Sequence, residues 1–90
     1  MELIDQMKNK VLIELVVPDL EEKYDVYIPI NKRVGNITIL LAKTIDDLSG
    51  GYYKDYDNVG LYSGVTGERY AIDMLIRDSD IRNGSRIILM

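Results

Sequence analysis

Few side chains in this 90-residue sequence could do chemistry, because it contains no His and no Cys. Without Cys there is no thiol nucleophile, thiolate zinc site or iron–sulfur cluster, and without His there is no imidazole base or histidine metal ligand. Carboxylates, lysines and tyrosines remain, and these side chains also serve as ordinary surface residues. The composition therefore excludes most designs of a small active site.

One segment, residues 55–60, begins like a calcium-binding loop, with Asp, Asp and Gly at the appropriate spacing. Such a loop also needs an oxygen ligand at its fifth position and a bidentate Glu at its twelfth. Val59 and Thr66 occupy those positions, so the match fails twice. We expect a solvated loop there, and no bound metal or cofactor anywhere in the chain.

Two aspartate pairs, Asp46 with Asp47 and Asp78 with Asp80, are the candidates for carboxylate catalysis. A catalytic pair needs a pocket that shifts its pKa values, and a chain of this length has little mass with which to build one. We therefore expect surface charges or turn caps, no catalytic residue and no enzyme activity. The tyrosines of loop 52–58 either stack on bases, anchor a partner or half-pack the loop.

The charge balance argues against a nucleic-acid partner. Acidic residues number 15 and basic residues 11, which gives a formal net charge of −4, whereas nucleic-acid binders usually show a basic patch. No apolar run approaches the ~20 residues of a membrane span, and the N-terminus lacks the basic and apolar regions of a signal peptide. We expect a cytoplasmic protein with no membrane insertion, in which residues 1–10 form a poorly ordered leader.

The first elements that the sequence predicts are two strands joined by a short turn. Residues 11–17 form a β-branched run that ends at Pro18, and Glu14 indicates that even positions face outward and odd positions face the core. Residues 24–28 alternate with period two. These two segments predict a hairpin.

A helix over residues 33–49 follows, because the apolar spacing changes to three and four. Asn31 is a possible cap at its start, Leu40 and Thr44 widen its apolar stripe, and the glycines at 50 and 51 end it. The stripe consists of Val34, Ile37, Leu41, Ile45 and Leu48.

The second half of the chain predicts two short strands, at residues 59–62 and 69–71, and a final strand at 86–90 after a tight Asn83-Gly84 turn. One helix stripe and the inner faces of these strands must share one core. The compact solution is an α+β fold of the β-grasp type, in which the first and last strands pair in parallel at the centre of a mixed four- or five-stranded sheet. We expect one domain, residues 11–90, with a core that adds Ile13, Leu15, Val17, Val26, Ile28, Ile81, Ile87 and Leu89 to the helix stripe.

The C-terminal segment from Ile76 to Leu89 resembles the corresponding part of ubiquitin-like proteins, with Gly84 where a positive φ is needed. Within that superfamily the ending Ile81-Arg82-Asn83-Gly84-Ser85-Arg86-Ile87-Ile88-Leu89 is similar to that of the YukD-like family of bacterial type VII (Esx-type) secretion systems. The segment Tyr24-Asp25-Val26-Tyr27-Ile28-Pro29, followed by Val34 and Ile37, shares the resemblance.

The resemblance implies a small, cytoplasmic, non-conjugating protein that acts as an accessory or regulatory factor through contact with another secretion component. Two alternatives stay open. The chain could be a ubiquitin-like module of another assembly or of a membrane component. It could also be a sulfur carrier or modifier without its diglycine tail, although Gly50-Gly51 is internal and Leu89-Met90 ends the sequence.

The sheet face opposite the helix is the predicted partner-binding surface. The strand alternation places outward-facing apolar side chains on three neighbouring strands, where a contiguous patch would mark an interaction site. The same face could also close a homodimer. The predicted contact residues are Leu12, Val16, Tyr27, Tyr62 and Ile88.

Overall fold

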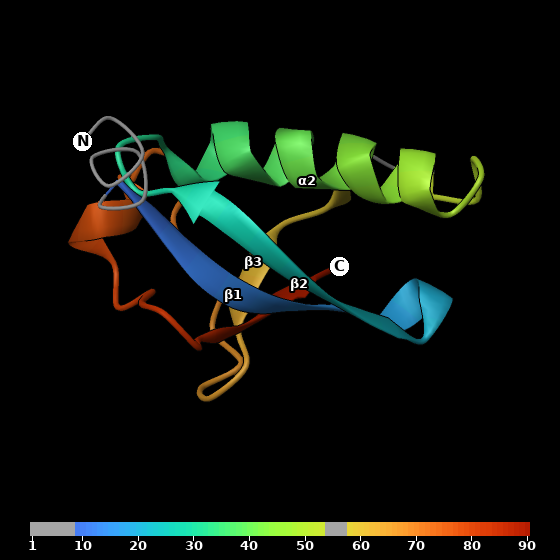
Figure 1. Ribbon diagram of the computed structural model, residues 1–90. Coiled ribbons are helices and arrows are strands. Elements are labelled where there is room, and N and C mark those ends of the chain that lie inside the picture. The colour runs from blue at the N-terminus through green and yellow to red at the C-terminus, as the bar shows by residue number, and fades with distance from the viewer. Residues whose placement is uncertain (1–8, 54–57) are drawn as a thin grey trace.

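The computed structural model describes residues 9–53 and 58–90 and shows one helix lying across one face of a four-stranded sheet (Figure 1). The strands are β1 (Lys10–Val17), β2 (Glu22–Pro29), β3 (Leu61–Ser63) and β4 (Arg86–Leu89), and the helix is α2 (Val34–Leu48). Among the described residues, the 3₁₀ helices η1 (Pro18–Leu20) and η3 (Ile76–Asp78) lie in the connections. Residues 1–8 of the expected leader lie outside the described residues, and β1 starts one residue before the expected strand.

The strand order is β2-β1-β4-β3, with β1 and β4 parallel at the centre and both outer pairs antiparallel. This is the expected β-grasp topology, and the α+β fold class is confirmed. Leu15 lies opposite Ile87 in the parallel pair, and both side chains are fully buried beneath the helix. β1 pairs with β2 over residues 10–17 and 22–29, so the hairpin is longer than the sequence predicted.

The helix begins differently from the expectation. Arg33, not Asn31, is the N-cap residue, and it makes no side-chain capping bond. The backbone N–H groups of Val34 and Gly35 instead donate to the carbonyls of Met74 and Ile72, at 2.8 and 2.7 Å. A distant loop therefore satisfies the first helical donors, which a local sequence pattern cannot reveal.

At the other end, the glycines stop the helix as expected. Gly50 and Gly51 both have positive φ, and their N–H groups donate to the carbonyls of Asp47 and Asp46. This pair of bonds is the Schellman arrangement. The turn carries the chain back beside the helix, where the Tyr53 N–H donates to the Asp46 carboxylate at 3.1 Å.

The core differs from the predicted one mainly along the helix. Leu48 was expected inside but is 62% exposed, because the returning chain places Tyr53, which is only 3% exposed, in the core at this end. Leu40 is also exposed, and the stripe is widened on its other side by Thr38 and Ala42. Val26 is only partly buried and packs against the edge of the core. The remaining predicted core residues are buried.

The segment after the helix forms less strand than expected. β3 covers Leu61–Ser63, whereas residues 59–62 were predicted, and the expected strand at 69–71 is reduced to a single bridge between Tyr62 and Arg69. Gly84 has φ +86 and its N–H donates to the Leu12 carbonyl at 2.8 Å, while the Asn83 side chain accepts from the Leu12 N–H at 2.8 Å. The Asn83-Gly84 turn thus joins β4 to β1.

Candidate protein-interaction surface

The register of the sheet brings three of the predicted contact residues into one row across three strands. Val16 of β1 is paired with Ile88 of β4, and Ile88 is paired with Tyr62 of β3. All three side chains are partly exposed, while their neighbours along each strand are buried or face the core. Because successive side chains of a strand alternate between faces, the row lies on the sheet face away from α2. We call these three residues the apolar row.

The other two predicted residues form a separate pair. Leu12 lies opposite Tyr27 across β1 and β2, and Tyr27 is 56% exposed. Glu14 stands between Leu12 and Val16 on the same face and makes an ion pair with Arg86, with Nε and Oε1 3.0 Å apart. A charged pair thus divides the apolar surface that the sequence predicted as continuous.

A second arginine borders the apolar row. The guanidinium carbon of Arg69 lies 6.0 Å from the centre of the Tyr62 ring, which is within the range of a cation–π contact. Gly60 makes room for this arrangement, because a Cβ there would lie 2.6 Å from the Arg69 Nε. The row therefore ends in an aromatic ring covered by a guanidinium.

Gly64 makes room for the Arg86 side chain of the ion pair, as Gly60 does for Arg69. Its N–H donates to the Arg86 carbonyl at 2.8 Å, and a Cβ on this residue would lie 2.6 Å from the Arg86 Cγ. The glycine therefore lets the turn after β3 pass close to Arg86. No local sequence pattern links Gly64 to a specific charged side chain, because the contact depends on the register of β3 and β4.

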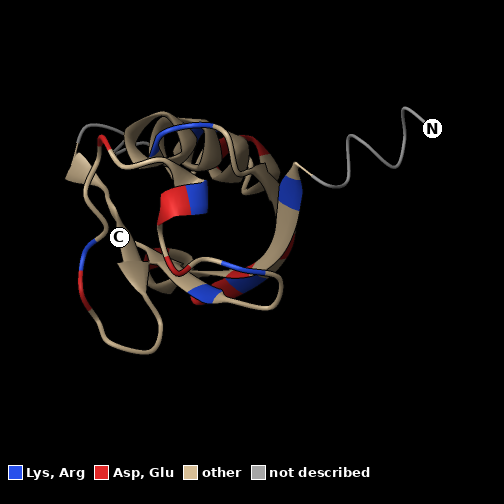
Figure 2. Ribbon diagram, turned by 90° about the vertical axis from the view of Figure 1, so that its left-hand side faces the viewer, with Lys and Arg blue, Asp and Glu red and all other residues tan. Residues whose placement is uncertain are grey.

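The residues that could have supported catalysis or metal binding are dispersed. In the part of the chain that the structure describes, no three His, Cys, Asp or Glu side chains group into a candidate metal site. Asp55 and Asp57 of the calcium-like segment lie outside the described residues. Figure 2 shows acidic and basic residues interspersed along the strands and loops. Within the same described part, no helix has the length and apolar character needed to cross a membrane.

Asp80, a member of one candidate aspartate pair, accepts a hydrogen bond that links two segments of the chain. The Tyr70 hydroxyl donates to the Asp80 carboxylate at 2.7 Å and so ties the segment after β3 to the turn before β4. Burial, followed by this hydrogen bond, raises the pKa of Tyr70 above its ordinary value. Of the loop tyrosines, Tyr53 is buried, whereas Tyr52 is 84% exposed.

Comparison with known proteins supports the fold. No protein-family model matches the sequence, and no curated protein matches it. Among solved structures, a chain of the MycP5-free ESX-5 inner membrane complex aligns with a TM-score of 0.75 and 15% identity, over 91% of this chain. The match covers 21% of that chain, so this protein spans about a fifth of its length.

Two further structures match over nearly their whole length. The EccD5 ubiquitin-like domain from Mycobacterium xenopi gives a TM-score of 0.73 at 11% identity, with 90% of this chain and 92% of that domain aligned. A ubiquitin from Caldiarchaeum subterraneum gives 0.64 at 12% identity, over 89% and 90% of the two chains. The protein has a ubiquitin-like fold, as the resemblance in its sequence implies.

Proposed function

We propose that this protein is a non-enzymatic ubiquitin-like module of a type VII secretion system that acts by binding another protein of the system. The observation that carries the proposal is the apolar row of Val16, Ile88 and Tyr62 on the open face of the sheet. The partner is a secretion component that the module meets on the cytoplasmic side of the membrane.

The composition of the row supports a binding role. Interfaces take most of their binding energy from a few buried anchors, and Tyr and Arg are enriched among these. Tyr62 with Arg69 supplies such an anchor at one end of the row, and the aliphatic pair Val16 and Ile88 supplies an apolar centre. The ion pair of Glu14 and Arg86 lies beside this centre, where a polar rim is usual.

The pair of Leu12 and Tyr27 extends the proposed surface on the far side of that ion pair. A partner that covers all five predicted residues must also cover Glu14 and Arg86. Since burying an ion pair carries a desolvation cost, we assign the main contact to the apolar row and a secondary contact to Leu12 and Tyr27. The proposal thus ranks the predicted residues, which the sequence treated alike.

The assignment to a secretion system rests on two lines of support. The sequence resembles the YukD-like family, and the fold is similar to the EccD5 ubiquitin-like domain and to part of an ESX-5 inner membrane complex chain. The same comparisons favour one second candidate, in which the chain is a domain-sized relative of a membrane component and not an accessory factor. In both cases the module works by protein contact.

Affinity purification from cells that express the secretion system tests the proposal. The tagged wild-type protein is expected to retain a component of the system, identified by mass spectrometry, and the Val16→Asp variant is expected to lose it. A matched control is Leu40→Asp, since Leu40 is exposed on the helix side of the molecule. Retention of the same component by wild type and Val16→Asp would show that the apolar row is not the binding site. Retention of no secretion component would remove the proposed role.

A further inference from the structure

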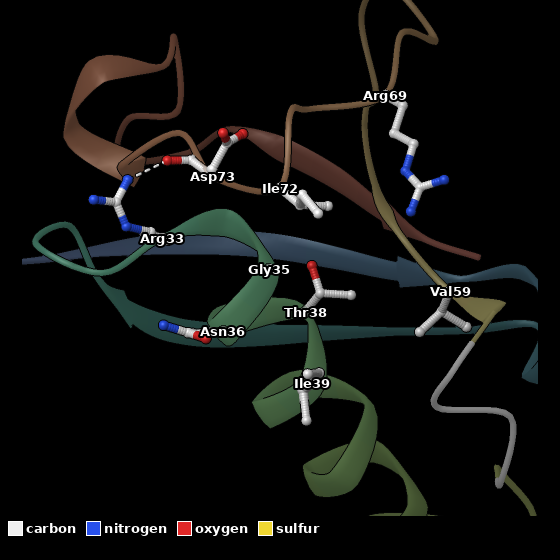
Figure 3. Close-up of a pocket in the computed structure, with 9 residues that line it drawn as sticks. All are labelled: Arg33, Gly35, Asn36, Thr38, Ile39, Val59, Arg69, Ile72 and Asp73. Atoms are coloured by element: carbon white, nitrogen blue, oxygen red, sulfur yellow. Dashed lines mark hydrogen bonds between the residues drawn. The ribbon is translucent and has the colours of Figure 1, made fainter.

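A pocket of about 450 Å³ lies beside the first turns of α2 (Figure 3). It is bounded by the first turns of α2, by the loop that precedes η3, and by the segment leading into β3. Its lining includes the apolar residues Ile39, Val59 and Ile72 and the charged residues Arg33, Arg69 and Asp73.

The loop is fixed against the helix at this position. The Gly35 N–H donates to the Ile72 carbonyl at 2.7 Å, and a Cβ on Gly35 would lie 3.1 Å from the same oxygen. The glycine therefore allows the loop to pack on the first turn of the helix. Because the loop carbonyls already accept from the first helical N–H groups, the pocket is not an anion site built on the helix end.

Two apolar side chains that line the pocket are largely exposed to water. Ile39 is 59% exposed and Ile72 is 60% exposed. Val59, which is only 9% exposed, also lines the pocket. Neither isoleucine takes part in the core that holds the sheet and helix together. A side chain inserted between them would remove both from water, which is favourable by about 25 cal/mol per Å² of apolar surface.

The charges at the rim of the pocket indicate what kind of partner segment would bind there. Figure 3 shows Arg33 and Arg69 on opposite sides of the pocket. The Arg33 guanidinium donates to the backbone oxygen of Asp73 and not to its carboxylate. Across the described residues, the ion pair that the structure shows is the one between Glu14 and Arg86, so neither rim arginine is paired with a carboxylate. With two arginines and one aspartate the pocket lining has a net positive charge, in a chain of net charge −4.

We propose that this pocket binds an acidic segment of a partner protein, which inserts one apolar side chain between Ile39 and Ile72 and sets carboxylates against Arg33 and Arg69. The site goes beyond the proposed function, and it shares with the apolar row only Arg69, whose guanidinium also lies over the Tyr62 ring. A module with both surfaces could hold two protein segments at once, one on the sheet and one beside the helix.

The probe for this proposal is the blocked tripeptide Glu-Leu-Glu, titrated into the isotope-labelled full chain and followed by two-dimensional NMR. We expect saturable shifts of the Gly35, Ile39 and Ile72 amides. Arg33→Gln and Arg69→Gln should each weaken binding roughly two- to fivefold, as expected for exposed charge pairs. Blocked Lys-Leu-Lys and Glu-Ser-Glu should give no saturable shifts at these amides.

Ile39→Ser and Leu40→Ser form the matched pair for the apolar contact, since both residues are exposed and adjacent on α2, but Ile39 lines the pocket. We expect Ile39→Ser to weaken binding of Glu-Leu-Glu roughly tenfold and Leu40→Ser to leave it unchanged. Equal effects of the two variants, equal binding of the Lys-Leu-Lys peptide, or no saturable shift at the pocket would each overturn the proposal. Shifts of the Val16 and Ile88 amides alone would also overturn it, while leaving the proposed function intact.

Discussion

Val16 and Ile88 face each other across the parallel pair of β1 and β4, and both side chains lie on the sheet face that the helix does not cover. Their immediate neighbours Leu15 and Ile87 form the equivalent pair on the buried face. The same pairing of strands therefore builds the centre of the core on one side and the centre of the proposed binding surface on the other. A substitution on the open side can change binding and leave the core in place.

Truncation of Leu41 to Ala should lower the free energy of unfolding by about 2–5 kcal/mol, because Leu41 is 4% exposed and its removal leaves a cavity. Leu48→Ala is the control, since this residue is 62% exposed despite its place on the same predicted stripe. Urea denaturation followed by circular dichroism measures both. Similar losses for the two variants would mean that the end of the helix is packed differently.

Gly84→Ala should destabilise the fold by about 1–2 kcal/mol, because an L residue is strained at φ +86. A Cβ at Gly84 would meet nothing within 4 Å, so the expected loss comes from the backbone alone. Gly84→Asn is the matched control, since Asn adopts this conformation more readily and should cost less. Equal stability of wild type and Gly84→Ala would show that this turn tolerates a different backbone conformation.

The ion pair between Glu14 and Arg86 should contribute little to stability. The Arg86 side chain is 59% exposed and that of Glu14 is 32% exposed, and partly exposed pairs of this kind couple by about 0.2–1 kcal/mol. A double-mutant cycle with Glu14→Gln and Arg86→Gln measures this coupling. We expect it to decrease as salt is added. A coupling well above this range that does not change with salt would show that the pair is shielded from water.

Tyr70 should make the stability depend on pH in the alkaline range. Because its pKa is raised in the folded state, chiefly by burial and then by the bond to Asp80, folding favours the neutral phenol. This contribution is fully present below the unfolded pKa of about 10 and is lost as the pH rises through the folded value. The stability difference between wild type and Tyr70→Phe, measured by urea denaturation, should therefore shrink above about pH 10. A stability difference that stays constant as the pH rises through this range would contradict the account.

Much of the fold followed from the sequence because local patterns and the global topology agree. The alternation around Glu14 indicated which side chains of β1 face the core. The spacing from Val34 to Ile45 indicated the buried face of the helix. Alternation along β1 placed Leu12 and Val16 on the outer face, and alternation along β4 placed Ile88 there. Their binding role stays a prediction.

The features that the sequence missed depend on contacts between distant segments. Leu48 lies on the helix stripe by its spacing, but Tyr53 covers that end of the core because the chain turns back after Gly51. The cap of α2 comes from Ile72 and Met74, nearly forty residues away, and no local motif marks them. The arrangement of Glu14 and Arg86 likewise became visible only once β1 and β4 were paired in register.

The most direct test of the proposed binding surface is the affinity of purified Val16→Asp and Ile88→Asp for the secretion component that the wild-type protein retains, measured by calorimetry. Both variants should keep the wild-type helical signal, because the side chains point away from the core, and both should lose binding. The Leu40→Asp control should bind as the wild type does. Folded Val16→Asp and Ile88→Asp variants that bind with unchanged affinity would contradict the assignment of the apolar row as the partner surface.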